Sequence, residues 1–434
     1  MTSDAPPGPP PSGGAEVVIL NQYYIPDVAS TGHLLAELAG ELVRLGRRVS
    51  VLTCFPSYGP RETWIDCPAQ ETLDGVSVRR LRTTRFRKDS TIGRLVNSFT
   101  FLVPLALRLL CTRTQGRVFM YTSNPPFLGL IGGAISLVRP HRYVVLLHDS
   151  YPHIPVLIGK LTKGSLIERA WHVANRLLYR RAAHTIVLCE GAKELIVRTY
   201  GVNPSRVHVV HNWADPTTLF PVPKSQSTFA RTNGYDRVFT LLYSGNLGLY
   251  YEFDTLLEAA KRLSGDPSFR LVFVGSGGKR QYIAERIAAM GLKNVDMHQY
   301  QPFETLNDSL NACDASLVTI APGVEGISFP SKLYSSLAVG KPVLALSEAG
   351  GELQRIMSDS GAGLWSPIGE VDALLSNIRR LREDHAASEA MGRKARELME
   401  RRYTIGAAAA EYAQVFDLAD AHAPAVVRAA AASR

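Results

Sequence analysis

The sequence predicts an α/β protein of two tandem doubly wound, Rossmann-like domains with a cleft between them. The length of 434 residues is too great for one ordinary core and suits two domains of roughly 200 residues. Short β-branched runs alternate with helix-period stretches, which is typical of a parallel sheet covered on both faces. A polar, proline-rich stretch over 215–237 interrupts this alternation and predicts an interdomain linker.

The first domain is expected over 16–214, after a Pro/Gly-rich tail at 1–15 that predicts disorder. Its first helix places four leucines on one stripe, at Leu34, Leu38, Leu42 and Leu45. The apolar runs that alternate with helices predict strands at Glu16–Leu20, Arg48–Thr53, Val76–Leu81, Arg117–Tyr121, Arg142–Leu147, His184–Leu188 and Val207–Val210.

The second domain is expected over 238–404. The helix after its first strand carries an apolar face of Phe253, Leu256, Leu257, Ala260 and Leu263. Its predicted strands are Val238–Tyr243, Arg270–Val274, Asn294–His298, Asp314–Thr319 and Pro342–Leu346. A further helix over 405–421 is expected to return to the first domain, and 422–434 is expected to be a frayed tail.

Composition limits the class of protein. Hydrophobic residues at 46% and charged residues at 20% exclude a disordered chain and a coiled coil. The net charge of +9 favours an acidic partner, which leaves phosphates, nucleic acid and an anionic membrane open. Five scattered cysteines without a C-x-x-C pair argue against disulfides and a cysteine zinc site and favour a reducing cytosol. No signal peptide or membrane-spanning segment is expected, because the apolar runs are too short.

Two strand-to-turn junctions of the second domain end in glycines, at Gly245–Gly248 and Gly275–Arg280. Glycine allows backbone N–H groups to approach a phosphate without an intervening Cβ. Neither junction fits the G-x-G-x-x-G fingerprint, and the P-loop pattern is absent. Tight βα turns are the alternative explanation, but two such junctions in one domain favour phosphate binding.

A third segment, 325–342, contains Ser331 after Pro330 and then Lys332. Ser331 is a suitable N-cap for a short helix over Ser331–Val339 that Gly340 would end. Free amides, a hydroxyl and an ammonium at a helix N-terminus suit a diphosphate. An ordinary capped helix with a solvated lysine is the alternative.

The histidines give weaker evidence for a functional site than the glycine junctions do. His148 and Asp149 follow the strand Arg142–Leu147 and are expected to point into the cleft, where either could orient a sugar or receive a proton. A polar loop is the alternative explanation. His208 and His211 lack a carboxylate pattern for metal binding, so no metal is expected.

These segments, in their order along the chain, resemble retaining glycosyltransferases of family 4, which have the GT-B fold. The similar group comprises the WbuB-type bacterial enzymes that build colanic acid, O-antigen and capsule. The likeness covers roughly Val17 to Ala413. Besides the two glycine junctions and the 325–342 segment, it rests on Ile19–Asp27, Tyr121–Pro126, His148–Pro152 and Val210–Asp215.

The resemblance implies a diphosphate site lined by Gly245, Asn246 and Gly248, together with Ser331 and Lys332. Gly275 of the second junction joins this expected set. No cofactor or metal is implied, because the nucleotide sugar is the substrate.

Glu325 matches the first glutamate of the family's E-x7-E motif, beside the donor sugar. There are two departures from the family. The second glutamate falls at Ser335, ten positions after Glu325, and Asn246 and Tyr251 stand where many members carry Arg and Lys. Lys332 is therefore expected to neutralise most of the phosphate charge, and Lys279 and Arg280 are the candidates to help it.

A basic stretch over 79–94 precedes the apolar stretch Phe99–Leu110. Its central cations are Arg82, Arg85, Arg87 and Lys88. The pair of stretches predicts a surface for anionic lipid. A solvated loop beside a core-packed helix is the alternative, and a nucleic-acid surface is not expected because no stacking platform is present.

Taken together, the sequence predicts an enzyme that moves a sugar from a nucleoside-diphosphate sugar, of UDP-hexosamine type, to a lipid-linked or saccharide acceptor of a cell-surface polysaccharide. Retention of configuration follows from the resemblance. The enzyme is expected to be cytoplasmic and peripheral on the inner face of the plasma membrane. A sugar-nucleotide epimerase of the same fold and a non-catalytic membrane-associated scaffold are the alternatives.

Overall fold

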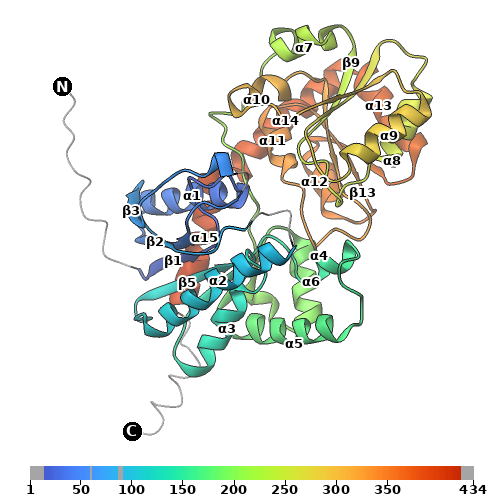
Figure 1. The fold of residues 1–434 in the computed structure, drawn as a ribbon. Coiled ribbons are helices and arrows are strands. Elements are labelled where there is room, and N and C mark those ends of the chain that lie inside the picture. Colours follow the sequence, from blue (N-terminus) through green and yellow to red (C-terminus); the bar gives the residue numbers. More distant parts are fainter. Residues whose placement is uncertain (1–13, 59–60, 87–90, 422–434) are drawn as a thin grey trace, which may run out of the picture. The chain divides into compact units, whose positions relative to one another are not determined.

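The computed structural model describes residues 14–58, 61–86 and 91–421, which form two compact α/β units (Figure 1). Unit 1 comprises the chain up to Leu188, Lys193–Val210 and the chain from Ala408 on. Unit 2 comprises Cys189–Ala192 and His211–Ala407. The predicted fold class is confirmed, because each unit is built on a sheet of mostly parallel strands. Residues 1–13 and 422–434, which hold most of the expected tails, lie outside the described residues.

The sheet of unit 1 has the strand order β3-β4-β2-β1-β5-β6-β7-β8. Neighbouring strands run parallel except β3 and β4, which are antiparallel. The strands are β1 (Glu16–Leu20), β2 (Val49–Cys54), β3 (Gln70–Leu73), β4 (Val76–Leu81), β5 (Arg117–Thr122), β6 (Tyr143–Leu147), β7 (His184–Val187) and β8 (Val207–Val209). All the strands predicted here are present, and β3 was not predicted.

The helices in the N-terminal half of the chain and at its C-terminus are α1 (Ser30–Arg44), α2 (Thr91–Cys111), α3 (Leu128–Val138), α4 (His153–Leu157), α5 (Leu166–Arg181), α6 (Glu190–Tyr200) and α15 (Ile405–Ala421). Helix α1 buries Leu35, Leu38 and Leu42, whereas Leu45 is 48% exposed. The predicted leucine stripe was therefore half right: Leu38 and Leu42 are buried, whereas Leu34 is only half-buried and Leu45 follows the last helical residue.

Helix α2 is longer than the sequence suggested. It contains 21 residues, begins at Thr91 and continues through Pro104. Within the described part of the chain it is the one helix long and apolar enough to cross a membrane, judged by length and composition. The expectation that this stretch is too short to span was therefore wrong. Its buried side packs into unit 1 through Phe101, Leu105 and Leu109, each fully buried.

Unit 2 contains an all-parallel sheet with the strand order β11-β10-β9-β12-β13-β14. The strands are β9 (Phe239–Ser244), β10 (Phe269–Val274), β11 (Val295–His298), β12 (Ala315–Thr319), β13 (Val343–Ser347) and β14 (Gly363–Pro367). The helices are α7 (Thr228–Thr232), α8 (Asp254–Arg262), α9 (Arg280–Met290), α10 (Phe303–Leu310), α11 (Lys332–Ala338), α12 (Glu352–Ser360), α13 (Val371–Glu383) and α14 (His385–Arg402).

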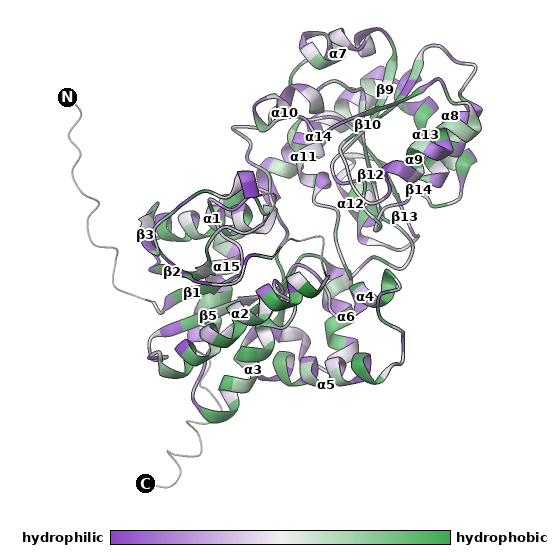
Figure 2. Ribbon diagram, viewed as in Figure 1, coloured by the Kyte–Doolittle hydropathy of each residue, from purple (hydrophilic) through white to green (hydrophobic). Residues whose placement is uncertain are grey.

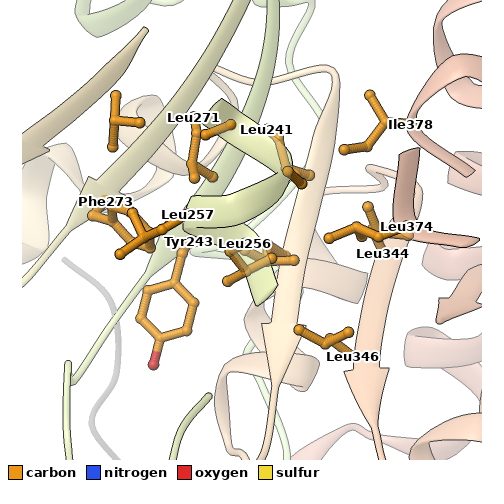
Figure 3. Packing of buried hydrophobic residues seen from close by; sticks show 14 of the residues in the cluster. Leu241, Tyr243, Leu256, Leu257, Leu271, Phe273, Leu344, Leu346, Leu374 and Ile378 are labelled. Atoms are coloured by element: carbon orange, nitrogen blue, oxygen red, sulfur yellow. The ribbon is translucent and has the colours of Figure 1, made fainter. Parts of the chain in front are cut away.

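The main core of unit 2 lies between one face of the sheet and helices α8 and α13. Figure 3 shows Leu256 and Leu257 of α8 beside Leu241 and Phe273 of the strands. Leu257 and Phe273 are both fully buried. The apolar face predicted for α8 is confirmed at its centre. This packing fixes β9 and β10, whose carboxyl ends carry the glycine junctions.

The stretch expected to be a linker, 215–237, belongs to unit 2 instead. Within it, α7 buries Ala230, and Tyr235 is only 2% exposed. Both residues pack against Val272 and Val274 of β10. The linker prediction was wrong because these few apolar residues, set among prolines and polar residues, cover the second face of the sheet.

Candidate active site

The two glycine junctions meet at the carboxyl ends of adjacent strands. Gly245 follows β9 with φ of 138°, and Gly275 follows β10 with φ of 144°. A Cβ atom at position 275 would collide with the carbonyl oxygen of Gly245. Side chains are therefore excluded at this point, and the backbones of the two junctions lie in contact.

The hydrogen bonds at this edge determine which amides are open to a ligand. The N–H of Gly245 donates to the carbonyl of Val274 at 2.9 Å, and the N–H of Gly275 donates to that of His298 at 3.0 Å. In contrast, the N–H groups of Asn246 and Gly248 have no acceptor among the described residues. The amides free to bind an anion here are therefore those of Asn246 and Gly248, whereas the two sheet glycines shape the backbone.

Lys332 lies against this edge. Its Cε atom would be 3.4 Å from a Cβ at Gly245, and the residue is 7% exposed. The Nζ atom lies 3.4 Å from the ring centroid of Tyr251 and 4.8 Å from that of Tyr243. Burial holds the pKa of Lys332 well below its usual range. No carboxylate of the described chain comes within 4.0 Å of its ammonium.

The residues around Lys332 differ in part from the prediction. Helix α11 begins at Lys332, one residue after the predicted start, and the Ser331 side chain is exposed and caps no amide. The amides of Leu333 and Tyr334 already donate to carbonyls at the start of this turn. The Ser335 hydroxyl donates to the Lys332 carbonyl at 3.0 Å. Little of the helix N-terminus is therefore free, and the lysine ammonium is its chief group for an anion.

The other two predicted cations bind backbone carbonyls. Lys279 Nζ donates to the carbonyl of Tyr251 at 2.7 Å. Arg280 Nη1 donates to the carbonyls of Gly275 at 2.6 Å and His298 at 2.9 Å. Both side chains thus brace the loops and strand ends around the glycine junctions.

Glu325 lies at the N-terminus of α12. Its Oε1 accepts a hydrogen bond from the backbone N–H of Glu352, and a Cβ at Gly351 would collide with its carboxylate. A carboxylate in this position satisfies an otherwise open amide and interacts favourably with the helix dipole. In this arrangement Glu325 is held in place by the helix that it caps.

A buried carboxyl–imidazole pair lies beside it. The Glu352 side chain is 6% exposed, and its Oε1 lies 3.4 Å from His211 Nε2. Its Oε2 accepts from the N–H of Glu190 at 2.6 Å. Burial, reinforced by the carboxylates of Glu190 and Glu325, raises the pKa of Glu352 to about 7.

Sequence reasoning missed this pair, because its members come from segments far apart in the chain. His211 was considered only as a metal ligand. A glutamate that follows β13 after two glycines was the available signal for Glu352. Within the described residues no group of three or more His, Cys, Asp and Glu side chains is arranged to hold a metal ion.

His148 and Asp149 belong to unit 1, whereas the residues above belong to unit 2. They follow β6, and their N–H groups donate to Ser123 Oγ at 3.1 and 3.0 Å. His148 Nδ1 is buried without a partner in the described chain, and burial lowers the pKa of His148 to about 4. Burial also raises the pKa of Asp149. His148 is therefore neutral at pH 7.

Of the four predicted membrane cations, the structure describes two. Arg82 is exposed. The Arg85 guanidinium lies over the rings of Phe55 at 5.5 Å and Trp64 at 5.6 Å. Arg87 and Lys88 lie outside the described residues.

Glu352→Gln is expected to stabilise the protein more at pH 8 than at pH 5. The folded-state pKa of about 7 exceeds the ordinary glutamate value of roughly 4.3, so folding takes up a proton between these values. Stability therefore falls as the pH rises through this window, and the uncharged glutamine avoids the loss. The gain should be roughly 2 kcal/mol larger at pH 8, measured by urea unfolding. Glu383→Gln, at an exposed position, is the control. An equal gain in the free energy of unfolding at both pH values would contradict the raised pKa of Glu352.

Comparison with known proteins agrees with this architecture. Residues 31–213 match the family model described as "Glycosyl transferase 4-like domain", and residues 225–398 match "Glycosyl transferases group 1". The probable glycosyltransferase WbjE of Pseudomonas aeruginosa is 24% identical over 391 residues, covering 90% of this chain and 94% of WbjE. The putative colanic acid biosynthesis glycosyl transferase WcaI of Escherichia coli is 22% identical over 377 residues, covering 84% and 91%.

Among solved structures, Anabaena HepE in complex with UDP superposes with a TM-score of 0.68 at 16% identity, covering 92% of this chain and 98% of HepE. HepE has also been solved with UDP-glucose. This likeness supports the fold, whereas the two family models together account for most of both units. The chain is therefore a two-domain GT-B glycosyltransferase of the family 4 type.

Proposed function

We propose that this glycosyltransferase moves a sugar from a nucleoside-diphosphate sugar, of UDP-hexosamine type, to a lipid-linked or saccharide acceptor of a cell-surface polysaccharide, with retention of configuration. One observation carries the donor assignment: the buried Lys332 ammonium lies beside the glycine junction that leaves the amides of Asn246 and Gly248 open. A cation and free N–H groups at strand ends are complementary to a diphosphate.

The similar proteins support a uridine nucleotide in the donor and an acceptor in polysaccharide assembly. The complexes of HepE with UDP and UDP-glucose favour a uridine nucleotide for this chain. The name of WcaI, which refers to colanic acid biosynthesis, favours an acceptor in polysaccharide assembly. The hexosamine sugar and the retention of configuration rest on the resemblance of the sequence motifs.

In the proposed transfer, the bond from the anomeric carbon to the diphosphate oxygen breaks and a bond from the acceptor hydroxyl oxygen to the same carbon forms. Negative charge then accumulates on the leaving diphosphate. Lys332 and the amides of Asn246 and Gly248 would stabilise that charge without rearrangement, since the packed strands and α11 fix them in advance. Ser331 and Ser335 provide hydroxyls at the same end of α11 for the rest of the donor.

Glu325 is proposed to act beside the donor sugar. Its carboxylate is oriented by the Glu352 amide, so it can stabilise positive charge at the anomeric carbon without losing its own position. His148 and Asp149 are proposed to orient the sugar or receive the proton of the acceptor hydroxyl. The neutral form of His148 at pH 7 suits a proton acceptor.

We also propose that the protein is cytoplasmic and binds peripherally to the inner face of the plasma membrane. Helix α2 exposes large apolar side chains along one side, including Phe99 at 58%, Val103 at 55% and Leu107 at 61%. Figure 2 shows hydrophobic colouring along much of α2. Phe101, Leu105 and Leu109 of the same helix are fully buried, which favours insertion of its exposed side chains over spanning. Exposed Arg82 and Arg85 supply charge complementary to anionic lipid.

Lys332→Ala tests the donor site. Loss of a charge-assisted contact should weaken UDP binding by roughly 1.5–3 kcal/mol, about 10- to 150-fold, in titration calorimetry. Lys261→Ala, which removes an exposed lysine of α8 in the same unit, should leave UDP binding unchanged. Equal affinity of the Lys332→Ala variant and the native protein would remove the basis of the proposed function.

Glu325→Gln should reduce kcat at least about tenfold while the donor KM changes less than about threefold, because its charge matters chiefly in the transition state. The glutamine oxygen can still accept from the Glu352 amide, so the helix cap should survive. Steady-state transfer kinetics provide the measurement. Glu348→Gln is a matched control, since this exposed glutamate also accepts from a loop amide, that of Gly323 at 2.7 Å. A raised KM with unchanged kcat would make Glu325 a binding residue.

Neutralising Arg82, Arg85, Arg87 and Lys88 should weaken sedimentation with anionic vesicles roughly 10²- to 10³-fold, at about 1 kcal/mol for each cation. Replacing Phe99, Val103 and Leu107 by serine should also release the protein, including from neutral vesicles. Serine at the exposed Phe220 and Phe303 of unit 2 is the control. Hydrolysis of a soluble donor should be spared in every variant. Unaltered vesicle binding at physiological salt by both sets of variants would refute the membrane role.

A further inference from the structure

The Lys332 ammonium is surrounded by aromatic rings. Its Nζ atom lies 3.4 Å from the Tyr251 centroid and 4.8 Å from the Tyr243 centroid, and the two rings meet edge to face at 6.0 Å. A buried lysine without a carboxylate would ordinarily lose its proton, whereas the faces of aromatic rings attract a cation. The rings thus oppose the effect of burial on this one side chain.

Both rings are held in place by the fold. The Tyr243 hydroxyl donates to the carbonyl of Asn246 at 2.7 Å, and its ring packs edge to face against Phe253 at 5.2 Å. Tyr251 packs against the same core, where its ring meets that of Tyr243 at 6.0 Å, and its carbonyl accepts from Lys279 Nζ at 2.7 Å. These contacts set the rings before any donor arrives, so the position of the ammonium is also set.

Neighbouring polar groups are engaged elsewhere. Lys279 binds the Tyr251 carbonyl, and Tyr300 donates to the Ser276 carbonyl at 3.2 Å. Glu252, next to Tyr251 in the chain, accepts from the N–H of Thr255 at 2.8 Å. The Glu252 carboxylate forms no ion pair with Lys332 within the described residues. The tyrosine rings are therefore the groups in contact with the ammonium that favour its charged form.

We propose that Tyr251, with Tyr243, is a positioning residue that keeps Lys332 charged and directed at the donor diphosphate. This inference rests on the proposed function, because it assigns the ammonium to a diphosphate. An aromatic residue would thus serve at a position where a second cation is expected from the family resemblance.

The test is UDP binding by titration calorimetry at pH 6.0 and 8.5 with Tyr251→Leu, Tyr251→Phe and the native protein. Without the ring, Lys332 should lose its proton at a lower pH. The leucine variant should therefore bind UDP roughly 5- to 30-fold more weakly at pH 8.5 and nearly normally at pH 6.0. The phenylalanine variant should match the native protein at both values. Tyr282→Leu, at a 40% exposed tyrosine of α9, is the control.

An equal loss of UDP affinity in the leucine variant at both pH values would overturn the inference. A loss of UDP affinity in the phenylalanine variant equal to that in the leucine variant would also overturn it.

A second measurement is independent of the donor: the titration of Lys332 in protein with ¹³C-labelled lysine, without ligand. Its midpoint should lie lower in Tyr251→Leu than in the native protein, and coincident midpoints would also overturn the inference. Should the leucine variant fail to fold, Tyr251→Met provides a flexible side chain without a ring. The remaining outcome is that the Lys332 midpoint is lower in Tyr251→Leu but the native protein binds no UDP. That outcome would refute the proposed function, whereas the effect of Tyr251 on the charge of Lys332 would stand.

Discussion

The close approach of β9 and β10 at their carboxyl ends determines the geometry of the candidate active site. The core of leucines and phenylalanines between the sheet and α8 fixes the two strands, and only glycine fits where Gly275 meets the Gly245 carbonyl. This contact uses the amides of both glycines within the sheet. It turns the chain so that the next amides, at Asn246 and Gly248, remain open, and it leaves room for the Lys332 side chain beside Gly245.

A second constraint is the concentration of carboxylates at the N-terminus of α12. Glu325 and Glu352 both lie at this helix end, although like charges repel and burial disfavours the charge of Glu352. The structure resolves this conflict with amides: the Glu352 amide binds Glu325, and the Glu190 amide binds Glu352. His211 adds a further partner to Glu352. The position of Glu325 thus depends on the Glu352 amide, a group that need not contact a substrate.

Much of the fold could be predicted because buried parallel strands are continuously apolar. The predicted strands appear within one residue of their observed ends, whereas β3 was missed because its sequence Gln70–Leu73 is mostly polar and lies at the sheet edge. Strand β14 was missed because it contains Trp365 and Pro367 at the opposite edge. Helix α2 was underestimated because Arg94, Asn97 and Ser98 interrupt the apolar residues of its first turns and Pro104 suggested a break.

The candidate site could be predicted only where a motif lies within one continuous segment of the sequence. Glycines after strands and a lysine after Pro-Ser identified loops that the structure brings together, but hydrogen-bond partners are set by tertiary contacts. Lys279 and Arg280 therefore appeared in the sequence as candidates to help Lys332, although they bind carbonyls of Tyr251 and Gly275. The pair formed by His211 and Glu352 could not be predicted as a pair, because the glycines before Glu352 give no indication of His211, which lies far away in the chain.

The contrast among these three cations supports the proposal that Lys332 is the main cation for the donor diphosphate. Lys279 and Arg280 already donate hydrogen bonds to backbone carbonyls. These bonds hold the site rigid, but they leave the two side chains less free to move toward a ligand. Lys332 contacts rings, which attract a cation without offering a lone pair that a phosphate would have to displace. A diphosphate arriving at the open amides would thus gain the full charge of the ammonium with little loss of existing hydrogen bonds, and preorganisation of this kind is what electrostatic stabilisation of a leaving group requires.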